Sequence, residues 1–139
     1  LCAIWPGHRI VKGILPAADA QRAVEAGADG IWVSNHGGRV LDCAPSAMHM
    51  LPLIRQAVGA DMPVMVDGGV RRGSDVIKAL ACGADFVFAG RPMMYGVAAG
   101  GQAGAAKALS IFQREMMLTV CQLGGWGTAM PPERIHSSR

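Results

Sequence analysis

The tripeptide Gly-Ala-Asp occurs three times, and it constrains the fold of this chain more than any other feature. The copies lie at residues 27–29, 59–61 and 83–85. Each copy follows a stretch with helical periodicity and precedes a short apolar run. Glycine suits the left-handed position that ends many helices. A joint that recurs between a helix and a strand predicts a serial β-α architecture.

The apolar runs after these joints are predicted to be buried parallel strands. They are Ile31-Trp32-Val33, Val64-Met65-Val66 and Phe86-Val87-Phe88, and an earlier strand is centred on Ile10-Val11. The runs are continuous rather than alternating, which is typical of parallel strands covered on both faces. Helical spacing of apolar residues predicts helices over 17–26, over 48–58, from an N-cap at Ser74 to Ala81, and over about 105–123.

Four β-α units in series predict an α/β fold with a parallel sheet. A complete (β/α)₈ TIM barrel takes ~250 residues, so a chain of 139 residues with four such units is expected to form half of one. We place this half-barrel in residues 1–124. Residues 125–139 are rich in glycine and proline and are expected to form an irregular or disordered tail.

The remaining composition sets limits on function and location. The four cysteines show neither metal-ligand spacing nor the density of a disulfide scaffold, so we expect reduced thiols that mostly fill the core, and no metal. No apolar run reaches the ~20 residues of a membrane helix, and no signal peptide is visible. We therefore expect a cytoplasmic protein.

The basic residues are placed unevenly along the chain. Lys12, Arg39, Arg71 and Arg91 each fall at the end of an apolar strand or just beyond it. They are four of the 13 Lys and Arg residues, and the nine that remain face ten Asp and Glu residues. The net charge of +3 is thus concentrated where a barrel gathers its chemistry. This indicates a small anionic ligand, whereas nucleic-acid binding favours a basic stripe that the sequence lacks.

The segment Ser34-Asn35-His36-Gly37-Gly38-Arg39-Val40-Leu41-Asp42 follows the second predicted strand. An imidazole changes charge near neutral pH, so His36 can take or give a proton there. A guanidinium matches a carboxylate with two parallel hydrogen bonds, so Arg39 can hold an acid substrate. Taken alone, the segment is equally compatible with a polar turn that contains a hydrogen-bonded histidine.

The ends of all four strands lie on one face of a barrel. Lys12 is expected to end the first strand, the His36 segment follows the second, residues 67–73 follow the third, and Gly90-Arg91 follow the fourth. Glycines let backbone amides approach a phosphate closely, and barrels commonly bind phosphate with the loops after their last two strands. Together these loops predict a phosphate site beside the His36 segment.

With these motifs, the chain closely resembles the carboxy-terminal half of the FMN-dependent 2-hydroxy acid oxidoreductases, which include glycolate oxidase, L-lactate dehydrogenase and mandelate dehydrogenase. The matching segments are residues 11–13, 34–39, 41–42, 67–73 and 90–92. The resemblance covers about residues 5–124 and implies FMN as the cofactor and a small 2-hydroxy acid as the substrate. Residues 5–6 and 41–44 look most like mandelate dehydrogenase.

The resemblance also implies residue roles. His36 is the active-site base in oxidation of the 2-hydroxy acid to the 2-oxo acid; whether it takes the carbon-bound or the hydroxyl proton stays open. Arg39 binds the substrate carboxylate. Lys12 lies near N1 and the C2 carbonyl of the flavin, where a cation stabilises negative charge, and Ser34 bonds to the ring system. The residues that the resemblance implies bind the ribityl and phosphate groups of FMN are Asp67, Gly68, Gly69, Val70, Arg71, Gly90 and Arg91.

The chain also departs from this family. Val40 stands where Gln is usual, and the family's amino-terminal half, with further cofactor and substrate contacts, has no counterpart in the sequence. In some relatives, an insertion in that half attaches the protein to the membrane. One alternative is therefore a non-catalytic half-barrel that binds FMN or phosphate. Pairing with the missing half or with a second copy is expected in either case. Another phosphate-binding barrel, such as an IMP dehydrogenase, does not account for His36 and Arg39.

Overall fold

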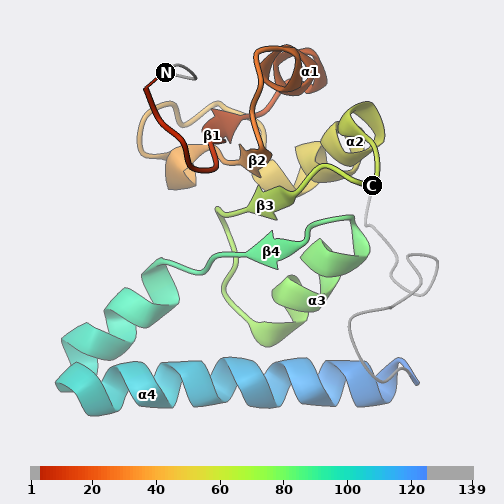
Figure 1. The fold of residues 1–139 in the computed structure, drawn as a ribbon. Helices are drawn as coiled ribbons and strands as arrows, with labels where there is room; N and C mark the ends of the chain where they lie inside the picture. Colours follow the sequence, from red (N-terminus) through yellow and green to blue (C-terminus); the bar gives the residue numbers. More distant parts are fainter. Residues whose placement is uncertain (1–3, 125–139) are drawn as a thin grey trace.

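The computed structural model describes residues 4–124 (Figure 1). The elements are β1 (Ile10–Ile14), α1 (Ala17–Glu25), β2 (Gly30–Val33), a 3₁₀ turn (His36–Gly38), α2 (Ala47–Val58), β3 (Val64–Val66), α3 (Gly73–Ala81), β4 (Phe86–Val87) and α4 (Arg91–Gln122). The strands form one parallel sheet in the order β1-β2-β3-β4. The predicted α/β architecture of four β-α units is confirmed, whereas the tail predicted for 125–139 lies outside the described residues.

One face of the sheet is buried beneath the helices. Side chains alternate between the two faces of a strand, and those on the helix side are fully buried: Ile31, Val33, Val64 and Val66. They pack against Ala20 of α1, against Ala47, Leu51 and Ile54 of α2, and against Ala79 of α3. In Figure 1, α1 lies above the sheet, α2 to its right and α3 below β4, and residues of all three belong to this one core. The continuous apolar strands thus form the core that their sequence predicted.

The opposite face of the sheet is partly open. Lys12, Trp32, Met65 and Phe86 are register partners across the four strands and share this face. The Trp32 ring stacks on Phe88 with ring centroids 4.0 Å apart, yet Phe86 is still 56% exposed. In a closed barrel this face lines the interior, so its exposure is what half of a barrel presents.

Two of the three Gly-Ala-Asp joints close their helices in the same way. Gly27 and Gly83 have φ angles of 88° and 99°, and their amides donate to Val24 and Leu80. The next amide in each joint donates five residues back, to Ala23 and Ala79 respectively. Both are Schellman motifs, in which the left-handed residue is usually glycine. The sequence prediction for these two glycines is confirmed.

The aspartates of the same two joints connect neighbouring strands. Asp29 accepts from the backbone amide of Arg9 at 2.8 Å, and Asp85 accepts from that of Val64 at 2.8 Å. The backbone amide of each aspartate donates to the carbonyl of the same partner, also at 2.8 Å. In the remaining copy, at residues 59–61, the chain runs through Met62 and Pro63 before β3 begins. Asp61 therefore does not form the contacts that Asp29 and Asp85 form.

The helices of the second half differ from the sequence predictions. Helix α3 begins at Gly73 with Arg72 as its N-cap residue, not at Ser74, because the Asp75 carboxylate accepts from the amides of Arg71 and Arg72. Helix α4 begins at Arg91, well before the predicted residue 105. Its backbone breaks at residues 100–101, and the long second part runs beside α3 (Figure 1).

The cysteines pack less than expected. Cys43 and Cys121 are free and exposed, and Cys82 is only partly buried. Cys43 lies in the loop before α2 and Cys121 in the last turn of α4, where neither faces the core. Burial raises the pKa of the Cys82 thiol above its ordinary value. Cys2 lies outside the described residues.

Candidate functional site

Three of the predicted site residues form one polar cluster at the carboxyl ends of the strands. The Lys12 ammonium lies 3.0 Å from Asp67 Oδ2 and donates to Ser34 Oγ at 3.1 Å. The Ser34 hydroxyl donates to the other oxygen of the Asp67 carboxylate. Ser34 is only 1% exposed, and these contacts satisfy its buried hydroxyl.

The position of Lys12 differs from the prediction that it ends its strand. Strand β1 continues to Ile14 across a register shift that begins after Lys12, and Gly13 takes a φ of +93° there. A bulge of this kind bends the strand and re-aims the adjacent side chains. Lys12 therefore reaches the ends of β2 and β3 from the middle of β1.

An aromatic ring covers one side of the Lys12 ammonium. The Nζ atom lies 4.9 Å from the centroid of the Trp32 ring, which is the distance of a cation–π contact. The ring nitrogen of Trp32 is buried without a hydrogen-bond partner among the described residues. An ammonium carries three N–H donors. Contacts to Ser34 and Asp67 account for two of them, so one donor remains for a ligand.

The His36 segment forms a left-handed turn. His36, Gly37 and Gly38 have φ angles of 55°, 68° and 74°, and a residue other than glycine is uncommon in this region. The His36 amide donates to Ser34 Oγ at 3.1 Å, which joins the turn to the Lys12 cluster. The Gly37 amide donates to Asn35 Oδ1 at 3.0 Å.

The His36 ring lies over the end of β1. A Cβ atom built on Gly13 would lie 2.9 Å from His36 Nε2, so the ring is in close contact with the backbone of β1 at its bulge. The His36 and Arg39 side chains are both exposed. In the described part of the chain, the Arg39 guanidinium forms no ion pair. A base and a cation are thus accessible on one turn.

The two predicted phosphate loops differ in what they offer. Gly68 and Gly69 have positive φ angles of 92° and 84°, while the Val70 side chain is only 4% exposed, which leaves the Val70 backbone as the part available to a ligand. At the start of α3, Asp75 accepts from the Arg71 amide and Glu115 of α4 accepts from the Gly73 amide at 2.7 Å. Carboxylates therefore already occupy donors that an anion would use at this helix start.

The loop after β4 is more open. An ideal Cβ atom on Gly90 would meet no atom within 4 Å, and the same is true at Gly69. The Arg91 side chain is exposed, and its Nη2 donates to the Gly37 carbonyl at 2.5 Å. Open backbone at two glycines beside an arginine is compatible with the close approach of a phosphate group.

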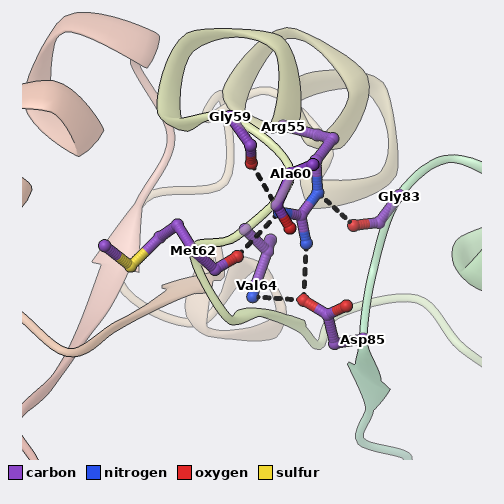
Figure 2. Close-up of polar contacts among 7 residues, drawn as sticks. All are labelled: Arg55, Gly59, Ala60, Met62, Val64, Gly83 and Asp85. Atoms are coloured by element: carbon purple, nitrogen blue, oxygen red, sulfur yellow. Dashed lines mark hydrogen bonds and ion pairs between the residues drawn. The ribbon is translucent and has the colours of Figure 1, made fainter.

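A cleft of about 390 Å³ lies at the other ends of the strands, beside Arg55. The Arg55 side chain donates to the carbonyls of Gly59, Ala60, Met62 and Gly83 and pairs with Asp85 (Figure 2). Its guanidinium is thus saturated by the protein itself. The amino-terminal face of a barrel contributes to stability rather than to chemistry, so we assign the Arg55 cluster a structural role.

Sequence reasoning gave no role to three residues of the site. Asn35 stabilises the turn through a side-chain to backbone bond that is common for Asn, and its place before His-Gly-Gly was a usable signal. Gly13 was visible only as part of a matching segment. Trp32 looked like an ordinary strand residue, because nothing in the sequence showed that its ring would meet the Lys12 ammonium.

Among the described residues, no helix is both long and apolar enough to cross a membrane. Among the same residues, no three His, Cys, Asp or Glu side chains gather in a way that would hold a metal ion.

Comparison with known proteins identifies the class to which this fold and site belong. The family model of the FMN-dependent dehydrogenases matches residues 1–129, and the chain belongs to this family. The peroxisomal (S)-2-hydroxyacid oxidase of Arabidopsis thaliana is 51% identical over 115 residues, which are 83% of this chain and 32% of that protein. The L-lactate oxidase of Nostoc sp. is 50% identical over 124 residues, or 89% of this chain and 34% of that protein.

The fold agrees with solved structures of the same kind. The chain is similar to the monotopic membrane protein (S)-mandelate dehydrogenase, with a TM-score of 0.91 and 43% sequence identity, over 96% of this chain and 36% of that chain. The α/β fold of the TIM-barrel class is therefore confirmed. The chain spans about a third of the length of the curated relatives that it matches.

Proposed function

We propose that this chain carries the carboxy-terminal part of the site in which an FMN-dependent enzyme oxidises an L-2-hydroxy acid to the 2-oxo acid. The observation that carries the proposal is the junction of two groups at one end of the sheet. Ser34 contacts both Lys12 and the His36 amide, so a cation and a base share one hydrogen-bonded unit. The relatives named for (S)-2-hydroxyacids, L-lactate and (S)-mandelate support a substrate of this class.

The structure fits FMN on two counts. Lys12 has one N–H donor left for a ligand, beside the Trp32 ring. Gly69 and Gly90 leave open space beside the backbone. FMN, the cofactor of this family, supplies an acceptor for the two electrons of the substrate when it is bound. The residues that would hold it are Lys12, Ser34, Asp67, Gly68, Gly69, Val70, Arg71, Gly90 and Arg91.

His36 and Arg39 act on the substrate in this proposal. Oxidation of a 2-hydroxy acid releases two electrons and two protons, and the exposed His36 imidazole takes one of the protons. Arg39 binds the substrate carboxylate through its guanidinium, which no acidic side chain of the described residues occupies. The two side chains come from one turn, so binding the carboxylate places the hydroxyl-bearing carbon near the base.

A second candidate function is non-catalytic binding of FMN or phosphate. The open inner face of the sheet favours it, because Phe86 is 56% and Ile10 45% exposed there. A closed barrel would cover these residues and complete the site. The partner for this face is either a second copy of the chain or a polypeptide that supplies the other half of a barrel.

The experiment that separates the two functions is an FMN titration of the purified chain, followed by anaerobic addition of L-lactate, glycolate or (S)-mandelate. Bleaching of the flavin absorbance supports the oxidase or dehydrogenase and names its substrate. A His36→Gln variant should bind FMN equally well but fail to bleach, because the amide does not accept the proton. FMN binding without bleaching by any of the three acids supports the non-catalytic function, and absence of binding contradicts both.

A further inference from the structure

We propose that Arg91 is a positioning residue, which couples the phosphate end of the cofactor site to the turn that carries His36. This inference rests on the proposed function, since it takes Arg91 as a phosphate ligand and His36 as the base. What it adds is a second task for Arg91, which begins with its contact to the Gly37 carbonyl.

The His36 turn needs external support. His36 has a φ of 55°, a conformation that disfavours side chains with a Cβ atom and persists only where the surroundings fix it. Two of its supports come from the preceding residues, because Ser34 and Asn35 accept from the amides of His36 and Gly37. These bonds hold the N–H side of the turn.

The support on the carbonyl side comes from another β-α unit. Arg91 Nη2 donates to the Gly37 oxygen across 54 positions of sequence, and a Cβ atom on Gly37 would lie 3.3 Å from the same nitrogen. The other hydrogen bonds of residues 36–38 within the described chain are formed with residues 34–39. The Arg91 bond is therefore the one that reaches the turn from a distant part of the described sequence. Arg91 thus fixes the turn relative to the rest of the sheet.

One guanidinium is able to serve both purposes. It carries five N–H donors in a rigid planar fork, and the bond to Gly37 uses one of them. The side chain is exposed at the first residue of α4, next to the open Gly90. A phosphate that binds the remaining donors restricts the guanidinium, and the shared side chain then restricts the Gly37 carbonyl and the adjacent His36.

The test compares Arg91→Ala with Arg71→Ala by NMR of the isotopically labelled 139-residue chain. Arg71 is the matched control, since it is an exposed arginine of the other phosphate loop and its side chain has no recorded bond to the turn. Without FMN, Arg91→Ala should shift the amide resonances of His36 and Gly37, whereas Arg71→Ala should not. Both variants should weaken FMN binding by about tenfold or more, as expected for loss of a charged hydrogen bond.

A third variant separates charge from geometry. Arg91→Lys keeps a cation for the phosphate but has no fork to bridge two acceptors. It should therefore retain more FMN affinity than Arg91→Ala while still losing the wild-type positions of the His36 and Gly37 resonances. In the wild type, FMN should slow hydrogen exchange of these two amides, and Arg91→Ala should abolish this slowing.

The results distinguish this inference from the proposed function. If Arg91→Ala weakens FMN binding but leaves the His36 and Gly37 resonances unmoved, Arg91 is a phosphate ligand only and the inference is wrong. If FMN binds without changing exchange of the two amides, the coupling is likewise overturned while FMN binding stands. Failure of the wild-type chain to bind FMN overturns both proposals, even if Arg91→Ala shifts the turn.

Discussion

The position of the His36 imidazole depends on a residue with no side chain. Gly13 takes a φ of +93° at the bulge of β1, and the space beyond its Cα atom is filled by the His36 ring, with Nε2 2.9 Å from an ideal Cβ position. Cβ atoms do not approach other atoms so closely. Gly13 therefore allows both the bulge and the contact that places the ring.

We predict that Gly13→Ala displaces His36. The alanine meets two obstacles, a strained positive φ that costs about 1–2 kcal/mol and contact with the imidazole. Gly69→Ala is the control, because Gly69 has a φ of +84° but no atom within 4 Å of its Cβ position. Urea unfolding should show the larger loss for Gly13→Ala. The excess should disappear when His36 is also changed to Ala, and an excess that survives in the double variant would contradict the contact.

At this scale the sequence predicted which side chains gather better than how they are arranged. It proposed Lys12, Ser34 and Asp67 as site residues, and the structure brings these three together. It placed Lys12 at the end of its strand, since a bulge leaves no signal beyond a glycine. The side-chain packing of Trp32 against the ammonium depends on the distance between strands, which a linear pattern does not contain.

At the scale of elements, the Gly-Ala-Asp joints fasten one β-α unit to the next. The hydrogen bonds from the Arg9 side chain and backbone hold the pKa of Asp29 below its ordinary value of 3.8. A carboxylate with a depressed pKa adds stability that is present above the unfolded pKa. That stability is lost as pH falls through the folded pKa. Asp29 therefore contributes to acid unfolding at and below about pH 4.

We predict that Asp29→Asn flattens the acid part of the stability profile. The wild-type urea midpoint should fall as pH is lowered from 5 to 3 (roughly the range in which such carboxylates protonate), and the variant should lose less over the same range. Asp61→Asn is the control, because the Asp61 side chain forms no hydrogen bond or ion pair with the other described residues. An equal acid response of Asp29→Asn and the wild type would show that the Arg9 contact adds nothing to folding.

Arg55 joins α2 to the joints before β3 and β4. Its guanidinium donates to backbone carbonyls on both joints, including Met62 and Gly83 at 2.7 Å each (Figure 2). The Arg55 side chain is only 18% exposed, so its removal leaves several carbonyls poorly satisfied. This network also holds the joint at residues 59–61, where Asp61 lacks the contact with a neighbouring strand that Asp29 and Asp85 form.

We predict that Arg55→Ala lowers the free energy of unfolding by about 3 kcal/mol, the order expected when several partly buried acceptors lose their donor. Arg22→Ala is the matched control. Arg22 is 75% exposed and pairs with Asp19 one turn away on α1, so its loss should cost less than about 1 kcal/mol. The two variants are compared by urea denaturation at neutral pH. Equal effects would mean that the carbonyl contacts of Arg55 add no stability.

Helix boundaries show the limit of sequence reasoning for elements. Helices α1 and α2 match the predictions within one residue, since apolar residues at helical spacing, such as Ala20, Leu51 and Ile54, face the core. The first part of α4 was missed because residues 91–104 contain four glycines, which weaken any helical pattern. Gly96 and Gly104 approach each other too closely for a Cβ atom, so tertiary packing explains these two small residues.

At the scale of the whole molecule, the described residues supply one end of the site and the sheet face beneath it. The Lys12 cluster and the His36 turn lie at one end of the sheet, and Trp32 and Phe88 fill the inner face beneath Lys12. The far side of this face has no cover among the described residues, and both β1 and β4 have one unpaired edge. Unpaired edges and exposed apolar side chains favour association with another chain.

We predict that the purified 139-residue chain self-associates through this inner face. Sedimentation velocity should show a dimer or larger species, and Phe86→Asp should shift it toward monomer, because Phe86 is 56% exposed on this face and a carboxylate there opposes apolar contact. Val40→Asp is the control, since Val40 is 79% exposed but lies on the loop after the His36 turn. A folded monomer at tens of micromolar would contradict self-pairing. It would leave a polypeptide that supplies the other half of a barrel as the partner for this face.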